Sequence, residues 1–178
     1  MKIWLLLIPF TLLQSTFPSE EEKIAWDENR KLRWEDFKGV PNAADDFVAS
    51  TNSGVSFSVS YREENGEAFL QYTVTANFYP KLSWYRSKDV SKYILAHEQT
   101  HFDITELHAR KLRKALAEIP QDRSFRDKAS ILYNKMEAER REMQLQYDAD
   151  SNHSNIEAEE YRWQDYVKEQ LKSFSAWK

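Results

Sequence analysis

The sequence of 178 residues contains no cysteine, which excludes disulfides, thiolate nucleophiles and cysteine metal ligands. It has only three glycines and five prolines, so we expect few loops and long regular elements. A basic excess is also missing, because the formal net charge is −4, whereas a nucleic-acid partner would normally require a basic face. The 41% of hydrophobic and 30% of charged residues are instead typical of a folded globular protein of one domain.

Long hydrophobic runs are scarce as well, and the clearest one lies near the N-terminus. Lys2 precedes the apolar residues 3–13, and small residues that suit cleavage follow. Because a membrane-spanning helix needs about 20 apolar residues, this order predicts a signal peptide over residues 1–19, with an uncleaved membrane anchor as the alternative. We therefore expect an exported protein, periplasmic or extracellular, with a single domain over residues 20–178 and no stable membrane insertion after cleavage.

The first half of the remaining chain shows the alternation of a β-sheet. Val55, Phe57 and Val59 alternate with serines, and an Asn-Gly pair suited to a hairpin turn follows. Similar alternation continues over residues 69–76. These patterns predict an antiparallel β-meander of three strands over residues 48–78.

The second half changes to helical spacing and predicts three helices. The first covers residues 90–116 and contains neither proline nor glycine. The second covers about residues 125–147, a polar loop follows over residues 147–153, and a capping box at residues 154–157 opens the third. The predicted fold class is therefore α+β, with a small antiparallel β-meander followed by three helices.

The first long helix contains the pattern H-E-x-x-H, in the sequence His97-Glu98-Gln99-Thr100-His101. Two histidines at i and i+4 lie on one helix face, so both imidazoles can bind one zinc ion at about 2.0 to 2.1 Å. The glutamate after the first histidine can take a proton from a zinc-activated water. We predict a zinc site with His97 and His101 as ligands and Glu98 as general base; the alternative is a pair of surface histidines.

A catalytic zinc ion needs a third protein ligand, and the chain has four histidines in total. His108 lies seven residues after His101, about 10 Å further along a helix, which is too far to share the ion. His153 in the predicted polar loop is therefore the favoured third ligand. Two acidic residues of that loop are close enough to accept hydrogen bonds from imidazole N–H groups, namely Asp148 and Asp150.

Several other residues are alternatives or supporting candidates. A glutamate on the second helix would give a ligand set of two histidines and a glutamate, and the candidates are Glu137, Glu139 and Glu142. Asp103 is placed to accept a hydrogen bond near the site or to form a surface ion pair. Tyr147 and Tyr161 flank His153 in sequence and are candidates to stabilise an oxyanion, with core packing as the alternative.

Three further motifs accompany the H-E-x-x-H pattern. In chain order, the four segments are WEDFKG at residues 34–39, SWY at 83–85, HEQTHFDI at 97–104 and YDADSNH at 147–153. Together they resemble a family of exported bacterial proteins, catalogued as domain of unknown function 922 and described as candidate zinc-dependent proteases. The resemblance implies a zincin-like fold and supports His153 as third ligand. Ser151 and Ser154 depart from the family pattern Y-D-x-x-T-x-H-G, where a threonine and a glycine stand.

We therefore expect an exported metallopeptidase with one zinc ion per chain and a peptide or protein as substrate. Glu98 acts as general base and then donates a proton to the leaving amine, and the strand over residues 73–78 lines the substrate cleft. Two alternatives stay open. One is a non-catalytic exported metal-binding or interaction module, and the other is a zinc amidase that acts on a cell-wall substrate.

Overall fold

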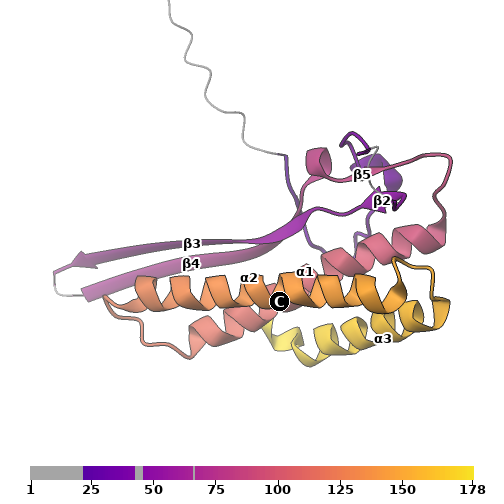
Figure 1. The fold of residues 1–178 in the computed structure, drawn as a ribbon. Coiled ribbons are helices and arrows are strands. Elements are labelled where there is room, and N and C mark those ends of the chain that lie inside the picture. The colour runs from indigo at the N-terminus through magenta and orange to yellow at the C-terminus, as the bar shows by residue number, and fades with distance from the viewer. Residues whose placement is uncertain (1–21, 43–45, 66) are drawn as a thin grey trace, which may run out of the picture.

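The computed structural model describes residues 22–42, 46–65 and 67–178. The signal peptide expected over residues 1–19 lies outside these ranges. The fold is α+β: a long antiparallel hairpin lies along the first two of three helices, and the third helix lies on their far side (Figure 1). This confirms the predicted class of a small antiparallel sheet followed by three helices.

The sheet is built mainly from two strands of equal length. Strand β3 (Ser53–Glu64) pairs with β4 (Glu67–Phe78) along its whole length, in register from Ser53 opposite Phe78 to Glu64 opposite Glu67. The short strand β1 (Ile24–Ala25) adds to the other edge of β4, so the strand order is β1-β4-β3. The third strand therefore comes from the start of the chain and not, as predicted, from residues 48–78.

A separate two-stranded ribbon accounts for the remaining β-residues. Strand β2 (Ala49–Ser50) pairs with β5 (Trp84–Tyr85) in antiparallel register. This ribbon differs from the prediction because β2 pairs with a later segment of the chain and does not join the sheet of the hairpin. Three short 3₁₀ turns complete this half and the C-terminus: Trp34–Asp36, Pro80–Leu82 and Ser175–Trp177.

The three predicted helices are present as α1 (Lys92–Ala117), α2 (Phe125–Ser151) and α3 (Glu157–Ser173). Ser91 caps α1, since its hydroxyl oxygen accepts a hydrogen bond from the Ile94 N–H at 3.3 Å. Helix α2 ends later than predicted, because the polar residues up to Ser151 remain helical. The predicted capping box at the start of α3 does not form, and Ile156 is the cap residue without a side-chain hydrogen bond.

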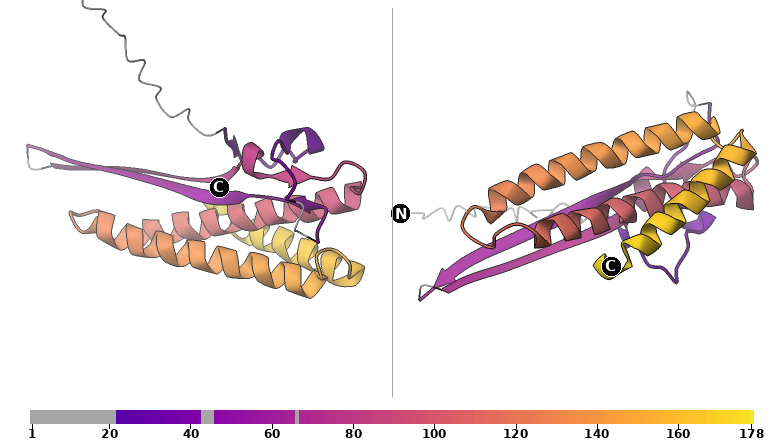
Figure 2. Two further views of the ribbon diagram at one scale, coloured as in Figure 1. Left: turned by 45° about the horizontal axis from the view of Figure 1, so that its top comes forward. Right: turned by 90° about the horizontal axis from the view of Figure 1, so that it is seen from below.

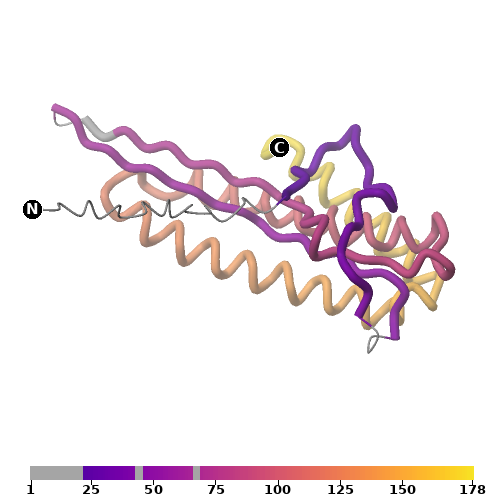
Figure 3. The backbone as a smooth tube through the Cα atoms, turned by 90° about the horizontal axis from the view of Figure 1, so that it is seen from above, coloured from indigo at the N-terminus to yellow at the C-terminus, as the bar shows by residue number. Residues whose placement is uncertain are grey.

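Helix α1 is the centre of the molecule and packs on every other layer. It contacts α2, α3, β3 and β4, as the views from further sides show (Figures 2 and 3). One apolar cluster fills the space between the hairpin, α1 and α2, and its buried members include Phe78, Phe102 and Leu112. A second cluster lies between α1, α2 and α3. Burial of each such side chain contributes about 1.5 to 3 kcal/mol, so packing on both sides stabilises α1.

Within the part of the chain that the structure describes, no helix has the length and apolar character needed to cross a membrane.

Candidate metal centre

The two histidines of the H-E-x-x-H pattern lie one turn apart on α1 and face each other. Their Nε2 atoms are 3.2 Å apart, and the ring planes are nearly perpendicular. Both residues are buried, with exposed fractions of 5% for His97 and 8% for His101. The N-terminal half of α1 therefore presents two imidazole nitrogens to one point.

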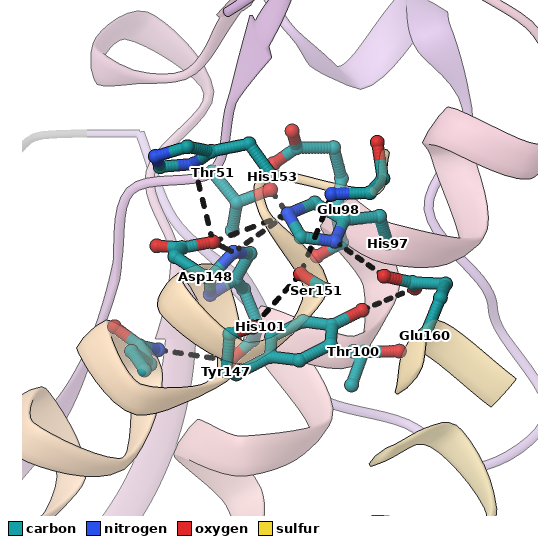
Figure 4. A network of polar contacts seen from close by, with 12 residues as sticks. Thr51, His97, Glu98, Thr100, His101, Tyr147, Asp148, Ser151, His153 and Glu160 are labelled. Atoms are coloured by element: carbon teal, nitrogen blue, oxygen red, sulfur yellow. Dashed lines mark hydrogen bonds and ion pairs between the residues drawn. The ribbon is translucent and has the colours of Figure 1, made fainter. Parts of the chain in front are cut away.

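Asp148, on the last turns of α2, completes a group of three ligand atoms. Its Oδ1 atom lies 3.0 Å from His101 Nε2 and 3.3 Å from His97 Nε2 (Figure 4). Among the described residues, His97, His101 and Asp148 form the group whose donor atoms converge closely enough to hold a metal ion. The site thus joins the N-terminal half of α1 to the C-terminal end of α2.

The spacing of these three atoms can be tested against zinc. A tetrahedral zinc ion with ligands at 2.0 to 2.1 Å places neighbouring ligand atoms about 3.3 Å apart. The three separations in the cluster are 3.0, 3.2 and 3.3 Å. Two imidazole nitrogens and a carboxylate oxygen are also a donor set that zinc accepts. The residues present therefore fit a zinc ion.

Glu98 lies beside the cluster and lines the same cleft. Only 2% of its surface is exposed, and its Oε2 atom has no hydrogen-bond partner among the described residues. A buried carboxylate oxygen without a partner is costly, typically by about 1 to 3 kcal/mol or more. A partner from outside the chain, such as a water molecule, would satisfy this oxygen.

Glu160 on α3 supports His97 from behind, and sequence reasoning missed this residue. Its Oε2 atom lies 2.9 Å from His97 Nδ1, while the Tyr147 hydroxyl and Gln164 Nε2 donate to its Oε1 atom (Figure 4). An Nδ1–H that donates to a carboxylate orients the ring so that Nε2 faces the metal position, and a metal bound there takes the place of the Nε2 proton. The sequence did offer one signal: Glu160 precedes Trp163 by three residues and Val167 by seven, the spacing of one helix face, so it falls on the apolar face of α3.

In this cluster burial and hydrogen bonding shift the pKa values in opposite directions, and hydrogen bonding has the larger effect. Burial lowers the pKa of His97, but its bonds to Asp148 and Glu160 outweigh this and raise the pKa to about 9. Burial likewise raises the pKa of Asp148, yet the bonds from His101 and His97 hold that pKa well below its usual value. Burial also raises the pKa of Glu160, but the hydrogen bonds from His97 and Tyr147 outweigh it, so the pKa of Glu160 is lowered. Both carboxylates therefore stay ionised, which favours a cation at the centre.

His153 lies next to the cluster but one step outside it. Its Nδ1 atom is 3.7 Å from Asp148 Oδ1, its ring stacks on Phe47, and 53% of its side chain is exposed. It follows α2 in a tight turn in which residues 152–154 all have positive φ, with 65° at Ser154. This backbone region favours glycine, which explains the glycine of the family pattern at that position. His153 as a metal ligand stays a prediction.

The other sequence candidates make contacts away from the cluster. Glu137 forms a buried ion pair with Arg140 at 2.8 Å, and His108 Nδ1 lies 3.0 Å from the Ile104 carbonyl oxygen. The remaining acidic candidates have partners elsewhere or are exposed. Asp103 accepts from Trp26 and Gln99, Asp150 accepts from Trp163 and Gln146, Glu139 pairs with Lys135, and Glu142 is exposed.

Neither tyrosine proposed for an oxyanion lines the cleft of the metal cluster. The Tyr147 hydroxyl is fully buried and donates to Glu160, and burial raises the pKa of Tyr147. The Tyr161 hydroxyl donates to Glu157 at 3.0 Å on the surface of α3. Tyr147 also stacks on His97 with ring centroids 4.6 Å apart, so it positions the imidazole.

A cleft of about 530 Å³ opens over the cluster. Its walls are residues 46–51 with β2, the N-terminal half of α1, the C-terminal end of α2 and the turn that carries His153. The strand over residues 73–78 does not line it, contrary to expectation. That segment belongs to β4, which pairs with β3 on one edge and with β1 on the other. The edge strand at the cleft is β2.

Comparison with known proteins gives one match. The family described as "Bacterial protein of unknown function (DUF922)" matches residues 27–154. No curated protein and no solved structure matches the chain. The matched range contains the metal cluster, Glu98 and His153, while Glu160 on α3 lies beyond it.

Proposed function

This chain belongs to the bacterial protein family of unknown function DUF922, and we propose that it is an exported zinc-dependent metallopeptidase. One observation carries the proposal. Three ligand atoms converge at the spacing of a tetrahedral zinc site, and beside them a buried carboxylate oxygen of Glu98 has no partner in the described chain. A purely structural metal site does not need such a carboxylate, whereas hydrolysis requires a general base that takes a proton from the attacking water.

In this proposal His97, His101 and Asp148 hold the zinc ion. We favour Asp148 over His153 as third ligand because its oxygen already lies within 3.3 Å of both imidazole nitrogens. Glu160 accepts the Nδ1–H of His97 and so keeps the Nε2 lone pair directed at the ion. When bound, zinc supplies a Lewis acid that polarises the scissile carbonyl and acidifies the attacking water.

Glu98 is the residue that moves the proton. Its carboxylate accepts a proton from the attacking water and then donates it to the amine that leaves. The buried position of Glu98 excludes bulk water, so the proton stays on the carboxylate until the amine departs. Removal of the carboxylate charge alone should therefore stop hydrolysis without opening the fold.

The substrate in this proposal is an extended peptide that lies along β2. One edge of β2 is paired, since Arg86 N–H donates to the Val48 carbonyl at 2.8 Å and β5 continues the ladder. The alternation of an antiparallel strand directs the backbone groups of Ala49 to the opposite edge, at the cleft. Residues 48–51 line that cleft, so a peptide can add there as a further strand.

The test is Glu98→Gln, assayed with a fluorogenic peptide mixture and by elemental analysis for zinc. We expect unchanged zinc content and a loss of hydrolysis of about 10²- to 10⁴-fold, the usual contribution of a general base. Glu118→Gln, at the exposed C-terminal cap of the same helix, is the matched control and should keep full activity. Equal hydrolysis by wild type and Glu98→Gln would rule out this mechanism.

A zinc-loaded wild type that cleaves no peptide but cleaves cell-wall amide crosslinks would turn the assignment to an amidase. A zinc-loaded wild type that hydrolyses neither substrate would turn it to a non-catalytic metal-binding module.

A further inference from the structure

A second and larger pocket lies on the other side of α1 from the metal cluster. Its volume is about 910 Å³, and its walls come from α1, α3, residues 26–32 and the C-terminal turn. Gln99 and Asp103 of α1 line this pocket, whereas Glu98 and His101 line the cleft of the metal centre. The two pockets are therefore separate, and nothing in the proposed peptidase reaction uses this one.

The wall of this pocket contains a buried guanidinium with an unused donor. Arg110 is 2% exposed; its Nε donates to Glu106 at 2.9 Å and its Nη1 to the Leu171 carbonyl at 2.6 Å. Its Nη2 has no hydrogen-bond partner in the described chain. The guanidinium lies 5.1 Å from the centre of the Trp26 ring, and both residues line the pocket. An unsatisfied donor on a buried cation is costly, and the charge of this guanidinium makes the pocket wall favourable for an anion.

The charge of Arg110 is not fully neutralised by its neighbour. The single carboxylate of Glu106 also accepts a hydrogen bond from Arg113 at 3.0 Å, so two guanidinium groups share one carboxylate. Around the pocket, the basic residues outnumber the acidic ones by six to three, although the whole chain carries a net charge of −4. Lys168 and Lys172 stand exposed on the α3 wall. The pocket is thus a positive region on an acidic protein.

Part of the lining is apolar and suits the body of an organic molecule. Trp26, Leu95, Val167 and Leu171 form this part of the wall, and the last two are buried core residues of α3. A cavity that combines an apolar wall with charged groups is typical of a small-molecule site. Its size is within the usual range of about 300 to 1,000 Å³.

We propose that this pocket binds a small organic anion, a carboxylate or sulfonate carried on an apolar body. The acidic head lies toward the buried guanidinium of Arg110 and the lysines of α3, and the apolar body covers Trp26 and Leu95. The proposal does not depend on zinc or on hydrolysis.

The test is fluorescence titration of the purified protein with anilinonaphthalene sulfonate, beside the uncharged N-phenylnaphthylamine, which has the same apolar body. We expect the anionic probe to bind more tightly, and octanoate but not octanol to displace it. The double variant Lys168→Glu/Lys172→Glu should weaken binding of the anionic probe by about tenfold and leave the neutral probe unchanged. The control Lys128→Glu/Lys135→Glu carries the same charge change on exposed lysines of α2 and should bind like wild type.

Arg110→Lys tests the buried donor directly, because it keeps a cation beside Glu106 and removes the Nη2 group. Weaker binding of the anionic probe with an unchanged circular dichroism spectrum is the expected result. If Arg110→Lys does not fold, the double variant Lys168→Glu/Lys172→Glu still tests whether the pocket binds the anionic probe. Equal affinity for the two probes, or equal loss in the α2 and α3 double variants, would overturn the proposal.

Discussion

At the scale of single residues, Glu160 is the least expected part of the candidate metal centre. It is fully buried and accepts hydrogen bonds at both carboxylate oxygens, from His97 at 2.9 Å, Gln164 at 2.7 Å and the Tyr147 hydroxyl. Its role is to fix the ring orientation and tautomer of His97, since a carboxylate behind a histidine orients the ring and strengthens it as a ligand. It belongs to α3, so this helix takes part in the site as well as in packing.

Glu160→Gln should therefore weaken zinc binding by about 10- to 100-fold, because the amide is a poorer acceptor for the His97 N–H. The measurement is zinc affinity by competition with a chromophoric chelator. The neighbouring Glu159→Gln breaks only an exposed ion pair with Arg162 and should leave the affinity unchanged. Identical zinc affinities for Glu160→Gln and Glu159→Gln would remove Glu160 from the site.

The sequence was a good guide to some of these residues for a physical reason. The relation between His97, Glu98 and His101 is local, since helical periodicity alone brings the two imidazoles 3.2 Å apart. Asp148 was expected near an imidazole, and its bond to His101 spans 47 residues of sequence. Glu160 could not be found in this way, because its link to His97 spans 63 residues and depends on how α3 packs on α1.

At the scale of elements, the end of α2 decides the shape of the site. Its polar composition predicted a loop over residues 147–153, yet α2 continues to Ser151. The helix persists because Tyr147 and Ser151 are fully buried on its inner face, where the Ser151 hydroxyl donates to the Tyr147 carbonyl at 2.8 Å. Tertiary burial of this kind is invisible to composition. As a result Asp148 is presented from a rigid helix, which holds its oxygen close to the two imidazoles.

Side chains in the middle of α2 hydrogen-bond to strand β3 of the hairpin, and Glu137 makes one of these bonds. Its Oε1 atom accepts from Arg140 at 2.8 Å and from the Val55 N–H of β3 at 3.3 Å. The Tyr133 hydroxyl donates to the Val55 carbonyl at 3.0 Å. Side chains of α2 thereby satisfy an edge residue of the sheet, which ties the hairpin to the helices.

Glu137→Ala should destabilise the protein by about 3 to 5 kcal/mol, because it leaves the buried Arg140 without its carboxylate. Zinc content of the folded fraction should stay at the wild-type level, since Glu137 is not part of the metal cluster. Urea unfolding and elemental analysis check the two statements. Glu142→Ala, an exposed glutamate of the same helix, serves as control. Folded Glu137→Ala that has lost its zinc would restore the second-helix glutamate as a ligand.

At the scale of the whole molecule, α1 is buried between two apolar clusters, and His108 is part of this interior. His108 is 2% exposed and its Nδ1 lies 3.0 Å from the Ile104 carbonyl oxygen. Burial is the main cause that lowers its pKa from 6.5 to about 4. His108 is therefore neutral in the folded protein at pH values where the unfolded chain would already bind a proton. His108 is not among the three residues whose ligand atoms converge.

The pH dependence follows from this difference. Above about pH 6.5 the His108 imidazole is neutral in both the folded and the unfolded protein, so it does not change stability. Below that pH the imidazole binds a proton in the unfolded chain but not in the folded protein. Stability should therefore fall by about 1.4 kcal/mol per pH unit from about pH 6.5 to pH 4, roughly 3 kcal/mol in all. Urea unfolding with a chelator present should show a flatter profile for His108→Gln than for wild type. Parallel profiles would contradict a neutral buried His108, and His153→Gln, at an exposed histidine, is the control.

The most direct test of the metal centre is the zinc content of the purified protein, measured by elemental analysis for wild type, Asp148→Ala, His153→Ala and Asp150→Ala. We expect about one zinc ion per chain in wild type and in the His153 and Asp150 variants, and little zinc in Asp148→Ala. Full zinc in Asp148→Ala with loss in His153→Ala would instead make His153 the third ligand. No zinc in wild type after reconstitution would contradict the metal centre itself.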